Sequence, residues 1–393
     1  MIHGFSHFGR WSIYSVSVNE LSKRKMSPSV LLISHGFQPS YEKGFANGVA
    51  ENGIRVELIS SDRTLAKELD PRIQINNLRG SQDPRRSIFA KTVNLIRYAF
   101  VLGSRIHSGK HDVTHLTGMF MTRNNVGGLI ERLAYRLLTR RFFMTVHDLL
   151  PHHQHTRLNK FIFRILYRLP DKLVVHTEKM RVGLITQFGV PAHRIIIMPH
   201  GVDELPARLQ APEPSASLRV LLFGGLNRYK GTDLFFEALQ HCQDLPIEVV
   251  MAGECRDAVY MRQIERLISG LSTNHIVRWD KAFIAEEKVG GFFEAVDAVV
   301  LPYRHIDQSG VLFTAFRYGT PVIATDVGAF RSCLPDFAGM IVPEQTPQSL
   351  AQTLREFSSR KIEFDRTRIR QHAQSLTWPV TVKPLICEYK ASC

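Results

Sequence analysis

A glycine-rich, basic loop is the stretch of this chain best suited to chemistry. Residues 224–231 read GGLNRYKG; they follow a predicted buried strand, Arg219–Phe223, and a helix is predicted to begin directly after them. Glycine lets the backbone approach a ligand closely, and a helix start offers N–H groups without intrahelical partners. Arg228 and Lys230 add two cations, so the loop is suited to hold a diphosphate. Taken alone, a solvated basic turn explains these residues equally well.

A second polar loop follows the predicted buried strand Ala298–Leu301. Ser309 and Gly310 precede a predicted helix that ends near Gly319, and Thr314 lies about one turn inside it. The N-terminus of such a helix can bind an anion or a hydroxyl group. For this stretch by itself, an ordinary strand–helix–strand crossover capped by Ser309 is the simpler interpretation.

Together the two loops resemble those of the large family of retaining glycosyltransferases called family 4, or glycosyl transferases group 1, which have the GT-B fold. The likeness rests on four segments in order and spacing: FGGLNRYKG at 223–231, AGE at 252–254, DAVVLPYR at 297–304 and YGTPVIATDVGAF at 318–330. It covers nearly everything from Val30 to about Tyr389 and is strongest over Arg219–Phe330.

The resemblance implies where a nucleotide sugar would bind. In the family a basic pair in the first loop binds the donor diphosphate, which assigns that role to Lys230 with Arg228 as its neighbour. Many members have an arginine where this chain has Gly225.

A second departure concerns the two glutamates, seven residues apart, that members commonly carry in the later loop. When the chain is aligned on its Gly-Thr-Pro segment at 319–321, Ile306 falls at the first glutamate position and Thr314 at the second, so both acids are missing. Thr314 could still hydrogen-bond the ribose, without the stronger charge-assisted contact. The predicted donor sugar and ribose contacts are Asp307, Gln308, Ser309, Gly310, Val311 and Thr314.

Two positions in the first half of the chain are also expected to face the donor. Residues 34–44, SHGFQPSYEKG, resemble the family's glycine loop, and Gly44, at the start of a helix predicted over Gly44–Asn52, is the expected backbone contact for the donor phosphate. Lys43 is expected to be solvated. His147 follows the predicted strand Phe142–Val146, where the family often has a histidine near the transferred sugar, so His147 is the candidate catalytic residue. By itself, a histidine at a strand end is as often a structural hydrogen-bonding residue.

No metal and no cofactor are expected. In the resembled family the leaving diphosphate needs no metal, and here Lys230, Arg228 and helix N-termini would neutralise it. His152, His153 and His155 lie close together, but no cluster of carboxylates or cysteines accompanies them, which disfavours a metal site. The five cysteines are scattered without metal-ligand spacing, which fits a reducing cytoplasm better than a disulfide framework.

The net charge of +14 lies entirely in the first half of the 393-residue chain. Residues 1–205 contain 29 Lys and Arg against 15 Asp and Glu, and the remainder contains 21 of each. Two predicted helices carry cationic stripes beside apolar residues such as Phe161, a pattern typical of helices that bind an anionic membrane surface. The stripes are Lys160, Arg164 and Arg168 on one helix and Arg132, Arg136, Arg140 and Arg141 on the other. A solvated helix face is the alternative.

Short apolar runs alternate with longer helical patterns along the chain, which is typical of parallel sheets covered on both faces. We therefore expect an α/β protein with two doubly wound Rossmann-like domains facing each other across a cleft and with ligands at the carboxyl ends of the strands. The resemblance implies that this is the GT-B fold. No apolar run approaches the length of a membrane span. The expected divisions are an N-terminal extension at 1–28, an acceptor and membrane-side domain at 29–205, a linker at 206–217, a nucleotide-sugar domain at 218–375 and a C-terminal helix at 376–393 that returns to the first domain.

These features predict a retaining, metal-independent hexosyltransferase. It would move a sugar from a nucleotide diphosphate sugar to a saccharide or polyprenyl-diphosphate-linked acceptor, in polysaccharide, exopolysaccharide or glycolipid biosynthesis. It would be cytoplasmic and peripheral on the inner face of the cell membrane. Two alternatives stay open: a sugar-nucleotide epimerase with the same diphosphate cleft, and a basic nucleic-acid binder. The second lacks any recognisable nucleic-acid module, and no nucleic-acid partner is expected.

Overall fold

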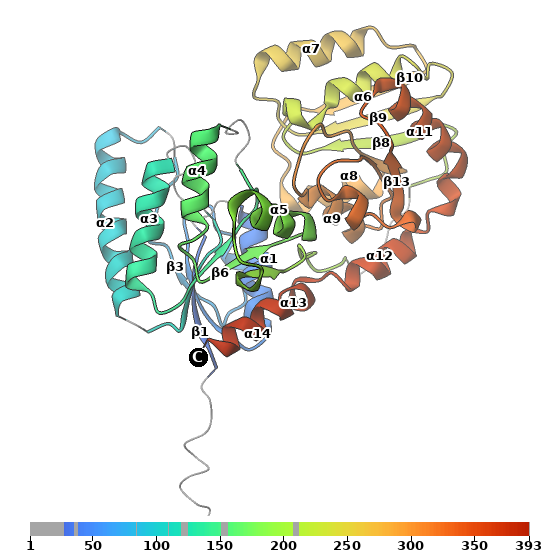
Figure 1. Cartoon of the computed structure of the whole chain (residues 1–393). Coiled ribbons are helices and arrows are strands. Elements are labelled where there is room, and N and C mark those ends of the chain that lie inside the picture. Colours follow the sequence, from blue (N-terminus) through green and yellow to red (C-terminus); the bar gives the residue numbers. More distant parts are fainter. Residues whose placement is uncertain are drawn as a thin grey trace, which may run out of the picture.

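The protein consists of two parallel α/β sheets, each flanked by helices (Figure 1). The computed structural model describes residues 27–34, 38–83, 85–108, 110–118, 125–150, 156–206 and 212–392. This is the two-sheet α/β architecture expected from the sequence. The predicted extension at 1–28, apart from its last two residues, and residues 207–211 of the predicted linker lie outside the described residues, as do His152, His153 and His155.

The first sheet has seven strands in the order β3-β2-β1-β4-β5-β6-β7, all parallel to their neighbours. The strands are β1 (Ser29–Ile33), β2 (Arg55–Ile59), β3 (Gln74–Asn76), β4 (Val113–Leu116), β5 (Phe142–Thr145), β6 (Lys172–Val175) and β7 (Ile195–Ile197). The longer helices are α1 (Pro39–Glu51), α2 (Ile88–His107), α3 (Asn125–Leu138), α4 (Arg157–Leu166) and α5 (Glu178–Phe188).

The continuous apolar sequence of β1 explains its central place in this sheet. Its side chains alternate between faces: Val30 and Leu32 join one buried cluster, whereas Leu31 and Ile33 join another. Helices α2 to α5 cover the second of these faces, and α1 covers the first. A strand that is buried on both faces needs apolar residues at every position, which is why β1 lacks the apolar–polar alternation of a half-exposed strand.

The second sheet has six parallel strands in the order β10-β9-β8-β11-β12-β13. They are β8 (Leu218–Phe223), β9 (Ile247–Ala252), β10 (His275–Asp280), β11 (Ala298–Leu301), β12 (Val322–Thr325) and β13 (Gly339–Val342). The helices are α6 (Thr232–Leu239), α7 (Ala258–Ser269), α8 (Glu286–Glu294), α9 (Gly310–Arg317), α10 (Phe330–Cys333), α11 (Pro347–Arg360) and α12 (Arg366–Gln374).

The chain passes between the two sheets twice, and the two passages lie side by side. The Val202 N–H donates to the Leu376 carbonyl at 2.7 Å, and the Trp378 N–H donates back to the Val202 carbonyl at 3.3 Å. Helices α13 (Trp378–Thr381) and α14 (Lys383–Ala391) then pack on the first sheet beside α1 (Figure 1). Tyr389 of α14 is fully buried there, and its hydroxyl hydrogen-bonds Nδ1 of His115 on β4.

Two predictions about local structure were incomplete. Helix α1 begins at Pro39, five residues before the predicted start at Gly44, because proline is favoured in the first turn, where its missing N–H costs nothing. The edge strands β3 and β13 were not predicted. Strand β3 is only three residues long, and two of its residues are exposed, so it has no apolar run to reveal it.

Candidate functional site

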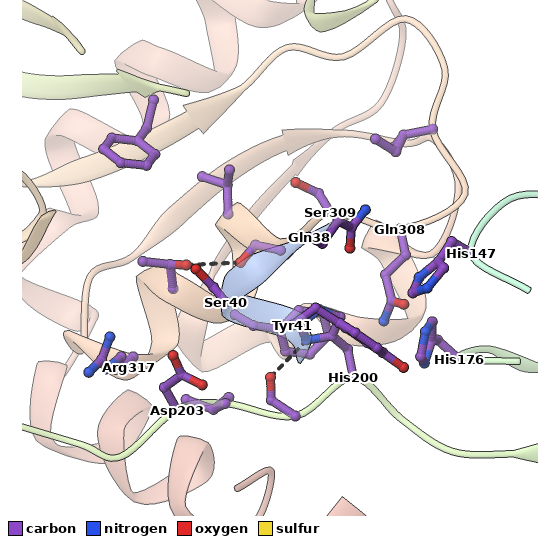
Figure 2. A pocket seen from close by; sticks show the side chains of 18 of the residues that line it. Gln38, Ser40, Tyr41, His147, His176, His200, Asp203, Gln308, Ser309 and Arg317 are labelled. Atoms are coloured by element: carbon purple, nitrogen blue, oxygen red, sulfur yellow. Dashed lines mark hydrogen bonds between the residues drawn. The ribbon is translucent and has the colours of Figure 1, made fainter. Parts of the chain in front are cut away.

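A cavity of about 500 Å³ lies between the two sheets at the carboxyl ends of their strands. Residues that follow the strands line it from both sides: His147 and His176 from the first sheet, and from the second Tyr303 and, at the end of the glycine loop after β8, Lys230. Figure 2 shows His147 and His176 beside Gln308 of the opposite domain. In parallel α/β sheets this edge is where ligands bind.

Lys230 is the cation that the glycine loop brings into this cavity. Its Nζ donates to the Phe223 carbonyl at 3.2 Å and lies 5.6 Å from the centre of the Tyr303 ring. No carboxylate among the described residues forms an ion pair with it, and burial lowers the pKa of its ammonium group. Gly224, at a φ of 87°, leaves the space that Nζ uses, since a Cβ there would lie 2.9 Å from it. A partly buried cation without a carboxylate partner is suited to an anionic ligand.

Arg228, predicted as the neighbour of Lys230 at the diphosphate, lies outside the cavity. Its Nε donates to Asp257 Oδ2 at 3.0 Å, and its guanidinium lies over the Tyr260 ring. Asp257 caps α7, so the guanidinium is held on the outer side of the loop by an acid that the sequence motif does not include. The structure therefore brings one of the two predicted cations to the cavity.

The second loop reaches the cavity as predicted from spacing. Gln308, Ser309, Gly310, Val311 and Thr314 all line it. Helix α9 begins at Gly310 with no side-chain cap on its N-terminus, so its first N–H groups point out of the helix without a capping side chain. The hydroxyl of Thr314 donates to the Gly310 carbonyl at 3.1 Å, one turn back.

Asp307 and Gln308 differ in what they do at the domain boundary. Asp307 does not line the cavity; its Oδ2 accepts the backbone N–H of Leu149 at 3.0 Å, a hydrogen bond that joins the two domains. Both polar atoms of the Gln308 side chain are buried without a hydrogen-bond partner among the described residues. Gln308 is therefore available for a ligand, whereas Asp307 already has a structural partner.

Asp148 is a carboxyl group that the sequence analysis did not single out. It lines the cavity, and burial together with the nearby charge of Asp307 raises its pKa to about 6. Its protonation state therefore changes near pH 6, in a cavity that also contains Lys230.

His147 has a fixed tautomer in the cavity wall. Its Nε2 lies 2.8 Å from the Thr117 carbonyl, and because a carbonyl can only accept, Nε2 carries the proton. Its ring meets that of Tyr41 edge-on at 4.7 Å, and burial lowers the pKa of the imidazole. His147 is thus a neutral ring with its proton on Nε2, and Nδ1 is its acceptor nitrogen.

Two further histidines, His176 and His200, were missed as site residues. His176 donates from Nδ1 to the Met198 carbonyl, and its Nε2 is buried without a partner among the described residues. His200 stacks on Phe313 of α9 with ring centres 5.0 Å apart, and burial lowers its pKa to about 4. His176 directly follows β6, and His147 lies two residues after the end of β5. The position of His176 at the carboxyl end of a strand could therefore have identified it from the sequence.

Gly44, predicted to contact the donor phosphate, does not line the cavity. It lies inside α1, and a Cβ on it would be 2.0 Å from Nε1 of Trp378, so the close approach that this glycine permits is to α13. Ser40 and Tyr41, in the first turn of α1, line the cavity instead (Figure 2). The correction follows from the earlier helix start, which moves Gly44 one turn away from the N-terminus.

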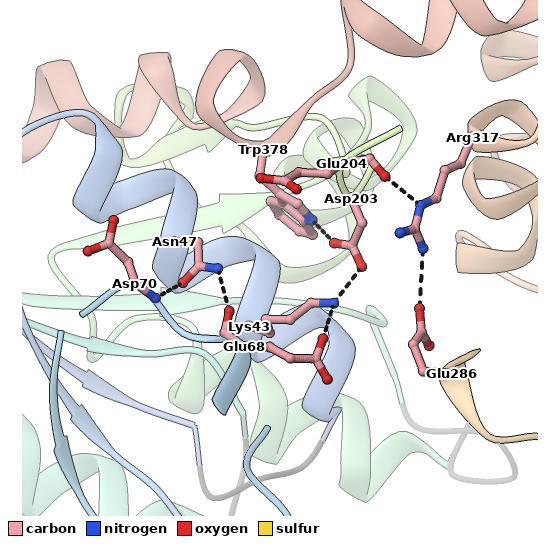
Figure 3. Close-up of polar contacts among 9 residues, drawn as sticks. All are labelled: Lys43, Asn47, Glu68, Asp70, Asp203, Glu204, Glu286, Arg317 and Trp378. Carbon is pink, nitrogen blue, oxygen red and sulfur yellow. Dashed lines mark hydrogen bonds and ion pairs between the residues drawn. The ribbon is translucent and has the colours of Figure 1, made fainter. Parts of the chain in front are cut away.

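Beside the cavity, ionic contacts tie the first domain to the interdomain crossing (Figure 3). The Lys43 ammonium pairs with Glu68 at 3.0 Å and with Asp203 at 3.1 Å, so the expectation that Lys43 is solvated was wrong. Asp203 also accepts from the Trp378 indole N–H at 3.0 Å. Arg317 of α9 donates to the Glu204 carbonyl at 2.8 Å, which links the second domain to the same crossing.

No group of three or more His, Cys, Asp or Glu that could hold a metal ion occurs within the described residues. The three histidines of the cavity are tied to carbonyls or rings at separate strand ends. The carboxylates of Asp148, Asp203 and Glu286 also line the cavity, and Asp203 and Glu286 are paired with Lys43 and Arg317. The cavity otherwise offers an ammonium group, a helix N-terminus, neutral imidazoles and an unpartnered amide, which together suit an anionic ligand rich in hydroxyl groups.

Comparison with known proteins agrees with this geometry. Residues 217–360 match the family described as "Glycosyl transferases group 1", and residues 42–204 match "Glycosyltransferase Family 4". A D-inositol 3-phosphate glycosyltransferase of Geodermatophilus obscurus is 26% identical over 239 residues, 56% of this chain and 53% of the relative. One from Corynebacterium urealyticum is 27% identical over 245 residues, 56% of this chain and 57% of the relative. The chain thus spans about half the length of the curated relatives it matches.

Solved structures share the fold at low sequence identity. Sucrose-phosphate synthase from Thermosynechococcus elongatus superposes with a TM-score of 0.72 at 16% identity, covering 93% of this chain and 100% of that one. HepE from Anabaena, in complex with UDP-glucose, gives a TM-score of 0.69 at 16% identity with the same coverage. With family matches on both halves and this shared architecture, the chain belongs to the group 1, or family 4, glycosyltransferases with the GT-B fold.

Proposed function

We propose that the protein transfers a hexose from a nucleotide diphosphate sugar to a saccharide acceptor, with retention at the anomeric carbon and without a metal. The observation that carries this proposal is the ammonium group of Lys230, which lies in the interdomain cavity with no ion-pair partner among the described residues. A diphosphate is the anion that a glycine loop and an adjacent helix N-terminus hold well.

The donor contacts follow from the lining of the cavity. The diphosphate binds between Lys230 and the open N-terminus of α9 at Ser309, Gly310 and Val311, and Thr314 hydrogen-bonds the ribose. This chain lacks the acidic ribose contact at Thr314, so more of the donor's binding energy must come from the diphosphate. As the donor bond breaks, charge develops on the diphosphate, and a positioned ammonium stabilises it.

The transferred sugar lies against the first domain in this arrangement. Gln308 and His176 present, from opposite sides, polar atoms without a hydrogen-bond partner among the described residues, and the acceptor nitrogen of His147 is Nδ1. Sugar hydroxyls can donate to either imidazole and both donate to and accept from the amide. Because these groups come from both domains, a bound sugar holds the two domains together. His147 is the residue we place against the reacting sugar.

The acceptor is proposed to be a saccharide on polyprenyl diphosphate at the inner face of the cell membrane. The excess positive charge of the first half supports this, because both the membrane surface and the lipid diphosphate are anionic. Lys160, Arg164 and Arg168 lie exposed on or next to α4, whereas Arg132, predicted to share in the second stripe, is buried against Met144. The proposed surface is therefore narrower than the sequence pattern indicated.

A thermal-shift screen with UDP-, GDP- and ADP-sugars tests donor binding. UDP-glucose is the first choice, because HepE, of the same fold, binds it. A ligand present at 100 times its dissociation constant stabilises the folded state by about 2.7 kcal/mol, which raises the melting temperature measurably. If none of these sugars raised it, the proposed function would be wrong.

Product analysis separates transfer from the alternatives. Incubation of the bound donor with a polyprenyl-diphosphate saccharide should release nucleoside diphosphate and extend the acceptor in α linkage from an α donor. An epimerised sugar nucleotide formed without acceptor would favour an epimerase, and salt-sensitive nanomolar binding of DNA or RNA without donor binding would favour the nucleic-acid binder.

A further inference from the structure

Helix α2 carries an apolar stripe on its solvent side. Phe89, Val93, Ile96 and Phe100 are 79%, 49%, 65% and 78% exposed, and their spacing of four, three and four residues puts them on one face of the helix. The opposite face, with Tyr98, Leu102 and Ile106, is buried in the core. The helix is therefore apolar on two sides, and only one of them is used by the fold.

The exposed apolar surface continues over the two neighbouring helices. Helix α3 packs between α2 and α4, and the three lie in a row on the outer side of the first domain (Figure 1). Most of the large apolar side chains that are exposed in the described part of the chain lie on these three helices. Those beyond α2's stripe are Ile88, Ile130, Leu133, Leu137, Leu158 and Phe161. Contiguous patches of this kind mark interaction sites.

The charge of the same surface has one sign. Helices α2 and α4 contain no acidic residue, and the single acid of α3, Glu131, accepts a hydrogen bond from the Tyr135 hydroxyl at 2.9 Å. Exposed cations lie beside the apolar side chains, among them Arg97 on α2, Lys160 on α4 and Arg168 just after it. An apolar centre with a cationic margin complements a surface that is anionic outside and apolar beneath.

We propose that α2, α3 and α4 form a docking surface for an anionic lipid bilayer, with the α2 stripe lying in the boundary between headgroups and acyl chains. A second copy of this surface is a poorer occupant, because a symmetric dimer would bring the same cations together. None of the described helices is both long and apolar enough to cross a membrane, so α2 lies along the bilayer plane.

The docking of α2, α3 and α4 on a bilayer does not depend on the proposed function. Only its consequence for the acceptor rests on that function. His147 and Asp148 follow β5 at the cavity, and α4 begins at Arg157, nine residues after Asp148. One of the docked helices, α4, thus follows closely in sequence after a strand end that lines the cavity. A lipid-linked saccharide would then approach the site from the membrane side of the first domain.

Vesicle flotation of the full chain tests the surface. The probes are vesicles containing phosphatidylglycerol and vesicles of phosphatidylcholine alone. We expect wild-type protein to bind the former more strongly, and F89S/F100S to lose binding by about tenfold or more, since it removes two aromatic side chains from the lipid boundary. K160Q/R168Q should lose about tenfold on phosphatidylglycerol vesicles at low salt. The matched control is F283S/I362S, because Phe283 and Ile362 are 80% and 93% exposed on the second domain.

Two results of the flotation experiment would contradict the docking surface. Equal vesicle binding by F89S/F100S and F283S/I362S overturns the proposal, as does a wild-type dimer that F89S/F100S converts to a monomer while neither binds vesicles. All positions changed are exposed, and unchanged melting temperatures establish that the variants fold. UDP-glucose should raise the melting temperature of F89S/F100S as much as that of wild type. If neither wild type nor any variant binds a donor but vesicle binding follows the expected order, the docking surface is supported and the proposed function is wrong.

Discussion

Replacing Lys230 by methionine separates donor binding from stability. The side chain keeps its length and apolar stem but loses the ammonium group, which donates to the Phe223 carbonyl and has no carboxylate partner among the described residues. In the ligand-free protein the partial burial of this cation costs stability, and the same desolvation lowers its pKa. We therefore expect Lys230→Met to leave the melting temperature of the free protein unchanged or to raise it.

The same substitution should weaken donor binding strongly. A hydrogen bond between charged groups contributes about 1.5–3 kcal/mol, and each 1.4 kcal/mol changes affinity about tenfold. The expected loss in affinity for UDP-glucose is therefore about 10- to 150-fold, measured by calorimetry. The loss in transfer rate should be at least as large, because the ammonium faces the charge that develops on the leaving diphosphate.

Arg228→Met tests the other cation of the loop under the same assay. Arg228 is paired with Asp257 and lies outside the cavity, so we expect it to change donor affinity by less than about threefold, the effect of one exposed ion pair. Lys281→Met, which removes an exposed lysine paired with Glu265, controls for overall charge. The reasoning is refuted if Arg228→Met and Lys230→Met weaken donor binding equally, or if Lys230→Met lowers affinity only in proportion to a loss of folded protein.

Two further predictions follow from the site and its supports. Gly44→Ala should destabilise the protein by about 1–3 kcal/mol in urea unfolding, because the added Cβ would overlap Trp378. The control is Gly291→Ala in α8, where an added Cβ would meet nothing within 4 Å, and this variant should be more stable by about 0.5–1 kcal/mol. If both variants were more stable than wild type, Trp378 would have to move freely. Asp148, with a pKa raised to about 6, is charged above that pH and neutral below it, so affinity for UDP-glucose, whose phosphates do not titrate in this range, should rise as pH falls from 7.5 to 5.5. Asp148→Asn should bind more tightly at pH 7.5 and lose most of this pH dependence; an unchanged pH profile would exclude Asp148 as its source.

The sequence placed residues correctly where their position depends on neighbours along the chain. Lys230 reaches the cavity because eight consecutive residues make a strand end, two glycines and a helix start. The Gln308–Thr314 segment reaches it because it also joins a strand end to a helix start. In parallel sheets the carboxyl ends of all strands lie at one edge, so locating a strand is enough to place the residues that follow it.

The sequence misplaced side chains whose position depends on a partner elsewhere in the chain. Arg228 pairs with Asp257, and Gly44 packs on Trp378, more than 300 residues away. Arg132 has the spacing of a surface cation, yet it is buried, with Nη1 donating to the Gly128 carbonyl and Nε next to Met144 Sδ. Periodicity reports which residues share a helix face, but it does not report which face the fold covers.

The sequence by itself determined the two-domain α/β architecture, the family and the loop that presents Lys230, because alternating strands and helices and glycine loops are local patterns. Only the tertiary structure decided which side chains meet. It joined His147, His176 and Gln308 across the domain boundary, tied Lys43 to Asp203, and left the stripe of α2 uncovered. These contacts depend on how the sheets and helices pack. Packing is set by the shapes of all the elements together, not by the residue spacing within any one of them.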